Sequence, residues 1–431
     1  MLHCSHCDTQ YLRWQGRCSE CNKWGTIAEE DGASIGSSST TTKKGGAAPA
    51  SLVDLAAAST KPTHRIPTGI TECDRVLSGG VVAGSVTLLA GEPGVGKSTL
   101  VAQLAAQLAG EAANALYVSG EESQGQIAMR FQRLGLSPNS ISFSNTIDVG
   151  SVVSAAAKLK PSVLIVDSIQ TALPQGVDTV PGTPTAVRAA TAQLIGFAKS
   201  SNIPVIIIGQ VTKDGAVAGP KTLEHLVDTV LSLEGDVDNV YRILRATKHR
   251  FGSTDEIGFF EMTAKGMESI ENPSARFLEE RADTPGSVVT CLMEGTRPVL
   301  VEIQALAEKS VFANPIRRTS GYDAGRLQML LAIINKRTKH SAAAMDVYVN
   351  VVGGMKIKEH AADLAVCTAI ISSLTDTAMS PDAAVFGELG LGGEVRSVPF
   401  LDKRIKESDR LGFKKPISPK SLKNLSDLKI G

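Results

Sequence analysis

The residues most able to do chemistry lie in one glycine-rich segment, GEPGVGKST, at positions 91–99. An apolar run typical of a buried strand precedes it, and leucines at four-residue spacing, typical of a helix, follow it. In such a strand–loop–helix, glycines let backbone N–H groups point at the phosphates of a nucleoside triphosphate. Lys97 would bridge the β- and γ-phosphates, and Ser98 would ligate Mg²⁺. The segment thus predicts a P-loop that binds ATP through Gly91, Glu92, Pro93, Gly94, Val95, Gly96, Lys97, Ser98 and Thr99.

Acidic and amide side chains end three other apolar runs and could complete a hydrolytic site. Asp167 ends VLIVD and is placed to hold Mg²⁺ through water, although a strand-end aspartate can also cap a helix. Glu121 and Glu122 follow ALYVSG; one of them would orient and deprotonate the attacking water, and we assign this role to Glu121. Gln210 ends PVIIIGQ and would touch the γ-phosphate. The expected catalytic residues are Lys97, Glu121, Asp167 and Gln210.

Four cysteines in the first 21 residues have the spacing of a metal site. Cys4 and Cys7 form one C-x-x-C pair, and Cys18 and Cys21 form a second. Each pair can place two sulfurs on one turn, and two such turns close a tetrahedral thiolate site. Four unrelated reduced thiols are the alternative, but this clustering favours metal over disulfides. We expect a structural Zn²⁺ in a ribbon over residues 1–30, because four sulfurs leave no open position for chemistry.

Length, charge and hydropathy limit the class of protein. A chain of 431 residues is expected to hold two or three domains. Lys plus Arg number 44, as do Asp plus Glu, so any nucleic-acid site must be a local basic patch in a neutral whole. No apolar run has the length of a membrane span, and the N-terminus lacks the pattern of a signal peptide. We expect a cytoplasmic protein with no membrane partner.

The elements that must position these residues follow two different patterns. Between residues 63 and 271, apolar runs alternate with helical patterns, which is typical of a parallel sheet covered on both faces. A hairpin closes this segment. Residues 272–431 instead suggest two strands, a helix, a further strand and a second helix, which indicates a separate α+β domain. Residues 31–62, rich in Ser, Thr, Gly and Ala, are typical of a flexible linker. The core strands of the first segment are expected at 85–90, 114–119, 162–167, 204–210 and 228–233.

In this order, the motifs resemble a known family. The P-loop, the glutamate after the second core strand, the strand-end aspartate and the later glutamine are similar to those of RecA-type ATPases. With the cysteine ribbon, TGITECDRVLSGGVVAGS, YVSGEES and KHRFG, nearly the whole chain resembles the RadA (Sms) family of bacterial DNA-repair proteins. The resemblance implies an α/β fold: a RecA-like P-loop ATPase core with a small N-terminal zinc ribbon and a C-terminal α+β domain similar to the Lon protease proteolytic domain.

The resemblance also implies a function. Members of the family form homohexameric, DnaB-like rings that use ATP to move along single-stranded DNA. This movement promotes branch migration of recombination intermediates, together with the recombinase RecA, in homologous recombination and DNA repair. A KaiC-like regulatory ATPase, which binds protein partners without moving on DNA, is the alternative function. Stimulation of ATP hydrolysis by single-stranded DNA would separate the two.

The pentapeptide KHRFG carries the implied contact between subunits. By the resemblance, Lys248 and Arg250 reach the ATP site of the neighbouring subunit and supply positive charge where negative charge develops. The family has asparagine at the second position of this motif, where the chain has His249, which leaves the strength of the coupling open. A basic hairpin tip in solvent is the alternative interpretation.

Two Gly- and Pro-rich segments are candidate DNA-binding loops of the ring. One follows Asp167 and ends at Arg188, and the other follows Gln210 and carries Lys213 and Lys221. Contacts of such side chains with phosphates do not depend on base sequence, and six copies in a central pore would offset the zero net charge. Ordinary solvated loop cations are the alternative interpretation.

The resemblance of the C-terminal domain to Lon raises the question of proteolysis. Lon proteases use a Ser–Lys dyad, and Ala361 stands at the position of the serine in EHAADLAV. Because the dyad cannot form an acyl-enzyme without an oxygen nucleophile, we exclude proteolysis. The domain is basic at Arg317, Arg318 and Arg326, among others, and we take Arg317 and Arg318 as candidate contacts for duplex DNA. A charged face that serves only assembly is the alternative.

Overall fold

The computed structural model describes residues 64–110, 114–210, 223–235 and 240–430, together with short pieces at 2–4, 10–11, 16–18, 21, 23–24 and 27–29. The chain divides into two compact units, Met1–Thr60 and Lys61–Gly431. In the first unit, three short strands form an antiparallel sheet of order β2-β1-β3. The linker expected at 31–62 lies outside the described residues. The strands of this unit are Leu2–Cys4 (β1), Gln10–Tyr11 (β2) and Ile27–Glu29 (β3).

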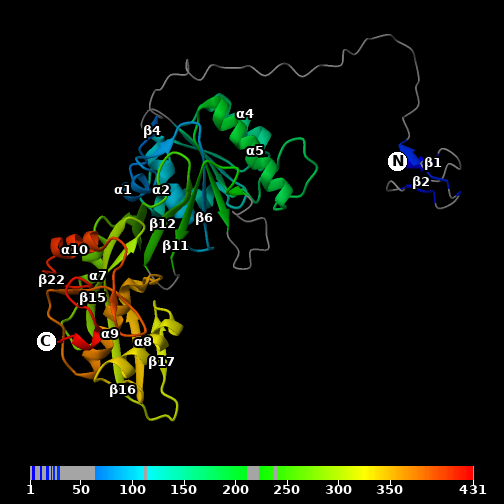
Figure 1. Cartoon of the computed structure of the whole chain (residues 1–431). Coiled ribbons are helices and arrows are strands. Elements are labelled where there is room, and N and C mark those ends of the chain that lie inside the picture. Colours follow the sequence, from blue (N-terminus) through cyan, green and yellow to red (C-terminus); the bar gives the residue numbers. More distant parts are fainter. Residues whose placement is uncertain are drawn as a thin grey trace, which may run out of the picture. The chain divides into compact units, whose positions relative to one another are not determined.

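A sheet of nine strands, counted over the described residues, organises the first part of the second unit (Figure 1). Its order is β14-β13-β12-β11-β6-β10-β9-β7-β8, and the neighbours from β11 to β8 run parallel. Strands β12, β13 and β14 extend one edge in antiparallel fashion. The expected parallel core and the hairpin after it are therefore confirmed. The strands are Val86–Gly91 (β6), Ala115–Ser119 (β7), Ile141–Ser144 (β8), Val163–Asp167 (β9), Val205–Gln210 (β10), Thr229–Glu234 (β11), Tyr241–His249 (β12), Ile257–Thr263 (β13) and Gly266–Ser269 (β14), with a separate pair Arg65–Ile66 (β4) and Val81–Val82 (β5).

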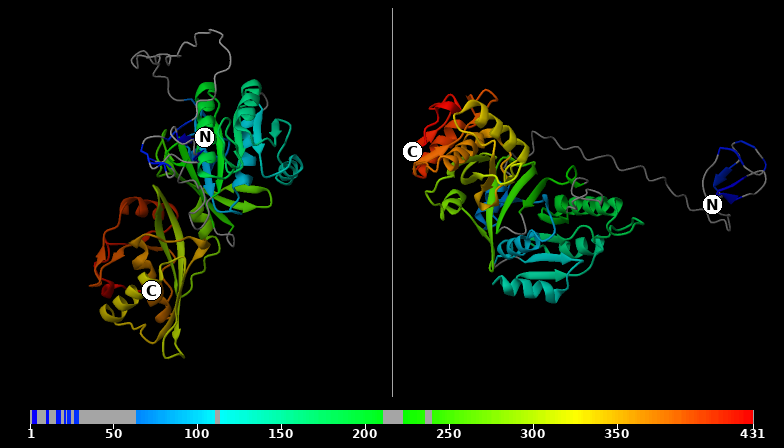
Figure 2. Two further views of the ribbon diagram at one scale, coloured as in Figure 1. Left: turned by 90° about the vertical axis from the view of Figure 1, so that its right-hand side faces the viewer. Right: turned by 90° about the horizontal axis from the view of Figure 1, so that it is seen from below.

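Helices cover both faces of this sheet (Figures 1 and 2). On one face, the predicted stripe of Leu100, Leu104 and Leu108 on α2 is buried in a core that includes residues of α1 and α3. On the other face, α4 and α5 lie side by side. Local sequence sets the helix starts, as where the Thr183 side chain caps α5 and Pro184 occupies its first turn. The helices are Thr71–Val76 (α1), Lys97–Ala109 (α2), Gln124–Arg133 (α3), Val149–Leu159 (α4) and Pro184–Ser201 (α5).

A second sheet, of six strands over the described residues, has the order β17-β18-β16-β15-β19-β22. The buried residues Leu327, Leu330, Leu331 and Ile334 of α8 pack against it, and α9 packs on the same core. Helix α9 begins at Asp363, after a short 3-10 turn, and the Glu359 carboxylate just before this turn pairs with the buried Arg404. The elements are Pro273–Leu278 (α7), Ser287–Glu294 (β15), Arg297–Lys309 (β16), Arg317–Ser320 (β17), Ala324–Arg337 (α8), Met345–Val351 (β18), Val352–Gly354 (η1), His360–Ala362 (η2), Asp363–Leu374 (α9), Ala383–Val385 (β19), Glu388–Leu389 (β20), Val395–Arg396 (β21), Leu401–Arg410 (α10), Lys415–Ile417 (β22) and Leu425–Asp427 (η3).

One hydrophobic core joins the two sheets. Ile257 and Phe259 of β13 belong to the same buried cluster as Phe277, Val299 and Val301 of the second sheet and its α7. The ATPase-like and Lon-like parts therefore pack directly on each other within one unit, and the expected boundary at residue 271 stays a prediction. Among the described helices, none combines the length and the apolar composition needed to cross a membrane.

Candidate active site

The glycine-rich segment connects β6 to α2 and ends where the helix begins, at Lys97. Gly96 adopts a φ of 109°, which favours glycine, and none of the described side chains caps the helix. The first backbone N–H groups of α2 are thus left for a ligand. The Lys97 ammonium donates hydrogen bonds to the carbonyl oxygens of Gly91 (2.8 Å) and Glu92 (2.9 Å). Burial lowers the pKa of Lys97, and the negative charge of Asp167 opposes this shift.

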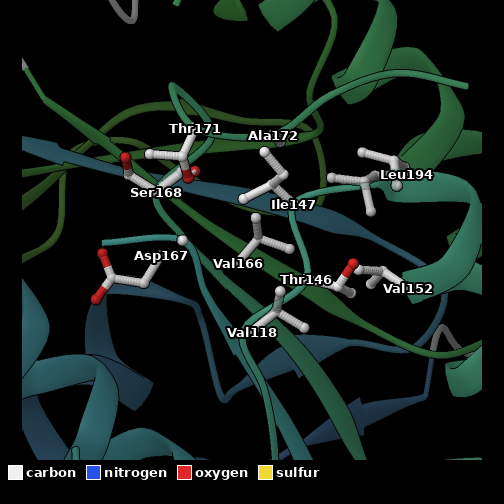
Figure 3. A pocket seen from close by; sticks show the side chains of 12 residues that line it. Val118, Thr146, Ile147, Val152, Val166, Asp167, Ser168, Thr171, Ala172 and Leu194 are labelled. Atoms are coloured by element: carbon white, nitrogen blue, oxygen red, sulfur yellow. Dashed lines mark hydrogen bonds between the residues drawn. The ribbon is translucent and has the colours of Figure 1, made fainter. Parts of the chain in front are cut away.

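Asp167 ends β9 with its carboxylate turned away from an apolar layer (Figure 3). Val118 and Val166 belong to that layer and line a cavity of only about 10 Å³ behind the site. The hydroxyl of Tyr117 on β7 donates a hydrogen bond of 2.8 Å to Asp167 Oδ2. Burial raises the pKa of Asp167, and the nearby charge of Glu121 adds to this, whereas the bond from Tyr117 lowers the pKa. Asp167 is therefore a buried carboxyl that a cation would stabilise in its charged form.

The two adjacent glutamates after β7 have different partners. Glu121 accepts hydrogen bonds from the Ser168 hydroxyl and from Gln210 Nε2, which lies 3.3 Å from both carboxylate oxygens. Glu122 instead forms a two-pronged ion pair with Arg130 of α3. Glu121 therefore faces the edge where β7, β9 and β10 end, and Glu122 is held against a helix. These contacts support Glu121 as the proposed general base.

The residues at this edge suit a magnesium–nucleotide complex. Ser98 in the first turn of α2 and Asp167 at the end of β9 offer the hydroxyl and carboxylate oxygens that Mg²⁺ prefers, and Ser98 is among the influences that lower the pKa of Asp167. The free N–H groups at the start of α2 and the ammonium of Lys97 suit phosphate oxygens. Bound Mg²⁺ would neutralise charge on the phosphates during cleavage. In such a complex these groups would hold the phosphates, and Glu121 would lie at the edge where a water could be positioned.

Lys248 and Arg250 lie at the opposite end of the sheet from the P-loop of their own chain. His249 between them pairs with Thr229, which is level with Thr87 near the start of β6. The P-loop begins at the other end of β6, four residues and about 13 Å along the strand from Thr87. Neither cation is therefore placed to serve the nucleotide site of its own chain.

Both cations are held at the end of β12 by groups near the start of β11. The Lys248 ammonium donates hydrogen bonds to the carbonyl oxygens of Glu224 (2.6 Å) and Val227 (2.8 Å). Arg250 Nη1 lies 3.0 Å from Asp228 Oδ1 and its guanidinium remains half exposed. The arrangement orients Lys248 and leaves Arg250 able to contact another molecule.

Comparison with known proteins identifies the family. Residues 54–216 match the AAA domain family, and residues 329–429 match the Lon protease (S16) C-terminal proteolytic domain. The DNA repair protein RadA of Aquifex aeolicus is 43% identical over 419 residues, which are 97% of this chain and 93% of that protein. The RadA proteins of Pseudomonas aeruginosa (44% over 422 residues; 97% and 92%) and Escherichia coli (43% over 421 residues; 96% and 91%) are equally similar. The chain belongs to the RadA family of DNA repair proteins.

Membership in the RadA family gives the general activity of each part of the chain. The RecA-like part is an ATP-binding ATPase domain of a DNA repair protein, and the C-terminal part has a Lon-like fold. Among solved structures, the KaiC-like protein PH0186 of Pyrococcus horikoshii is similar at a TM-score of 0.41 and 20% identity, over 48% of this chain and 100% of that one. So distant a likeness decides nothing about function.

The candidate DNA-binding residues of this RadA chain fall in three places. Arg188 lies on α5, exposed, in the second turn after the loop that follows Asp167. Lys213 and Lys221 lie outside the described residues. Arg317 and Arg318 are exposed on β17, an edge strand of the second sheet. The structure thus brings none of the described candidates into contact with the ATP site.

Arg326, counted above with the basic residues, does not belong to a DNA-facing surface. Its guanidinium forms an ion pair with Asp363, a carboxylate that is fully buried at the start of α9. The hydroxyl of Tyr322 and the backbone N–H of Leu389 also donate to this carboxylate. Removing Arg326 would leave a buried charge partly uncompensated, so its role is structural.

The expected zinc ligands are only partly described. Cys18 is buried, and the backbone N–H of Cys21 donates to its Sγ at 3.4 Å. Cys4 ends β1, but its side chain is not described, and Cys7 lies outside the described residues. Among the described residues no group of three or more potential metal ligands occurs. The Zn²⁺ site therefore stays a prediction.

Ala361, which the resemblance to Lon places at the position of the protease serine, is buried in the 3-10 turn before α9. Lys403 lies over the ring of Phe400, and both it and Lys406 are on exposed positions of α10. An alanine methyl cannot attack a peptide carbonyl, whatever base is near. The exclusion of proteolysis depends on this residue type and stays a prediction.

Three supporting residues escaped sequence reasoning. Tyr117 holds Asp167, Ser168 holds Glu121, and Arg242 holds the P-loop through a 2.9 Å hydrogen bond from its Nε to the carbonyl oxygen of Val95. Arg242 is 5% exposed on β12. The arginine at 242 in the alternating run YRILRAT could have indicated a supporting role, because a buried arginine needs hydrogen-bond acceptors. The position of Ser168 directly after Asp167 is a weaker indication of such a role.

Proposed function

We propose that this chain is a DNA-stimulated ATPase motor, a DnaB-like helicase or translocase on single-stranded DNA that promotes branch migration of recombination intermediates. The observation that carries the proposal is the separation of Lys248 and Arg250 from their own P-loop by the length of β6. Because Lys248 and Arg250 cannot reach the nucleotide bound to their own chain, they can act only on the nucleotide of a neighbouring subunit. A head-to-tail ring supplies one at every boundary, and a homohexamer is the ring we propose.

At such a boundary the chain's residues have separate tasks. Lys97 and the N–H groups of α2 hold the phosphates, and Ser98 and Asp167 hold Mg²⁺. Glu121 orients and deprotonates the attacking water, and Gln210, bonded to Glu121, senses the γ-phosphate. Lys248 and Arg250 of the adjacent subunit place positive charge where the leaving phosphate gains negative charge. Gln210 is the last residue of β10. Loss of its contact with the γ-phosphate on cleavage would therefore be transmitted directly to the segment that follows it.

DNA would be gripped by cations that converge in the ring. Arg188, Lys213 and Lys221 are the proposed contacts with single-stranded DNA, and Arg317 and Arg318 are the proposed contacts with duplex arms. Such contacts are sequence-independent and weaken as salt is raised. Branched recombination intermediates and the recombinase RecA are the proposed partners, Zn²⁺ on Cys4, Cys7, Cys18 and Cys21 is proposed to be structural, and the cytoplasm is the proposed compartment.

The test is ATP hydrolysis by the purified chain with and without single-stranded DNA at low salt. The proposal expects clear stimulation by DNA, its abolition in Lys97→Ala, and retained nucleotide binding without branch migration in Lys248→Ala. Equal turnover with and without DNA, and no DNA affinity at low salt, would contradict the motor and favour a KaiC-like regulatory switch. Normal hydrolysis and branch migration by Lys248→Ala would contradict the contact between subunits.

A further inference from the structure

A short turn of the Lon-like part packs on the hairpin that carries Lys248 and Arg250. Residues 250–256, here called the finger loop, connect β12 to β13, and Arg250 is the first of them. Residues 294–297, here called the β15–β16 turn, connect two long strands of the second sheet. The two segments are 40 residues apart in sequence and meet directly through Asp255 and Glu256.

The contact between the finger loop and the β15–β16 turn is close and specific. The backbone N–H of Thr296 donates to the carbonyl oxygen of Asp255 at 3.0 Å, and its hydroxyl donates to Glu256 Oε1 at 2.6 Å. Gly295 has a φ of +61°, and a Cβ added there would overlap the carbonyl oxygen of Asp255. Only glycine therefore allows the turn to approach the loop this closely.

Ion pairs flank this contact on both sides. Glu294, the residue before Gly295, pairs with Arg245 of β12. Arg297, the residue after Thr296, lies 2.6 Å from Glu72 Oε2, a fully buried carboxylate that also accepts from the backbone N–H of Phe259 on β13 at 2.9 Å. The turn thus holds both strands of the finger hairpin, through Arg245 of β12 and through Glu72, whose carboxylate contacts β13.

The opposite side of the finger loop is held by the ATPase-like part itself. The guanidinium of Arg65 donates to the carbonyl oxygen of Leu77 at 2.7 Å and to that of Phe251, the residue after Arg250. The finger loop is therefore fixed between Arg65 at its beginning and the β15–β16 turn at its end. Arg250 directly precedes the first of these anchors, and its own backbone N–H donates to the carbonyl oxygen of Asp228 at 3.1 Å, so its backbone has little freedom although its side chain is half exposed.

We propose that the β15–β16 turn is a positioning element for Arg250, so that the Lon-like domain sets the geometry of ATP hydrolysis in the neighbouring subunit. The inference rests on the proposed function, because it assigns a task to cations that act between subunits. Gly295 and Thr296 touch no nucleotide and act only through the finger loop. Misplacing a catalytic group by about 1 Å can lower turnover up to about a hundredfold, so a fixed loop has a measurable effect.

The test compares Gly295→Ala with Gly135→Ala in the full chain. Gly135 has a φ of +66°, close to that of Gly295, but an added Cβ meets nothing within 4 Å. The control therefore carries the same backbone strain without displacing the finger loop. We expect Gly295→Ala to lower kcat for DNA-stimulated ATP hydrolysis about tenfold or more, with the affinity for a fluorescent ADP analogue unchanged. Gly135→Ala should leave both values near those of the unaltered chain.

A double variant shows whether the turn acts through the finger. Arg250→Ala combined with Gly295→Ala should lose no more kcat than Arg250→Ala alone, since residues in one pathway are not additive. Additive losses, or a Gly295→Ala kcat no lower than that of Gly135→Ala, overturn the inference while Arg250→Ala remains impaired. A fully active Arg250→Ala overturns the proposed function instead. Should Gly295→Ala fail to fold, Thr296→Val decides in the same assay: a lower kcat with unchanged ADP affinity supports the positioning role, and an unchanged kcat overturns it.

Discussion

Arg242 Nε lies 2.9 Å from the carbonyl oxygen of Val95, so β12 touches the P-loop at one end and carries Lys248 near the other. Gly235 makes this contact possible, because a Cβ there would overlap the Arg242 side chain. One strand thus links the nucleotide site of a subunit to the cations proposed to serve its neighbour. The proposed function therefore implies that nucleotide binding at Val95 and the position of Lys248 are coupled through β12.

Replacing Arg242 with methionine should weaken ATP binding about tenfold. The hydrogen bond from a charged donor contributes about 1.5–3 kcal/mol, and part of that free energy holds the P-loop in its binding shape. Affinity for a fluorescent ATP analogue measures the effect, and Arg242→Lys, which keeps a cationic donor, should recover part of it. A folded Arg242→Met chain with normal affinity would show that the P-loop needs no such support.

Glu121→Gln and Glu122→Gln form a matched pair, because the residues are adjacent and the change is identical. Loss of the general base should lower kcat about a hundredfold or more in Glu121→Gln, with ATP binding retained. Glu122→Gln removes only a partly exposed ion pair with Arg130, which contributes about 0–1 kcal/mol, and kcat should stay near normal. Single-turnover measurements separate the rate of the hydrolysis step from the rate of product release. A larger loss of kcat in Glu122→Gln than in Glu121→Gln would instead identify Glu122 as the general base.

The stability of the fold should depend on pH through His249. Burial, and then the charge of Arg65, lower the pKa of His249. The unfolded chain therefore binds a proton more readily than the folded chain, and stability is lost as pH falls below about 6.5 toward the depressed pKa. Thermal unfolding at about pH 7.5 and about pH 5.5 should show a smaller decrease for His249→Asn than for the unaltered chain. Equal decreases would mean that His249 does not titrate in this range.

Charge reversal at β17 tests the proposed duplex contacts. Arg317→Glu with Arg318→Glu should weaken binding of the full chain to duplex DNA about tenfold or more at low salt and reduce its salt dependence. Lys414→Glu with Lys420→Glu changes net charge by the same amount on residues already paired with Asp409 and Asp402, and should have a smaller effect. Equal affinities for the two double variants would remove β17 from the DNA surface.

The sequence alone predicted the parallel core, the P-loop and the carboxylates at the strand ends, because each of these features depends on a local pattern. The P-loop follows a strand, and Asp167 ends one, so the carboxyl ends of parallel strands place them together without further knowledge. The bond from Tyr117 to Asp167 depends on the register that sets Ser119 beside Asp167, and no local pattern encodes a register. Arg326 looked like a free cation for the same reason, because its partner Asp363 is 37 residues away. Short edge strands such as β17 carry too few residues for a periodic signal.

Mixing two inactive variants tests most directly whether ATP is cleaved at a boundary between subunits. The Lys97→Ala chain keeps Arg250, here called the finger, but has no working P-loop. The Arg250→Ala chain keeps its P-loop but has no working finger. In an equal, randomly mixed ring, about a quarter of the boundaries join an intact P-loop to an intact finger. With single-stranded DNA present, we expect the mixture to regain up to about a quarter of normal ATP hydrolysis. A mixture no more active than the sum of the separate variants would contradict hydrolysis shared between subunits.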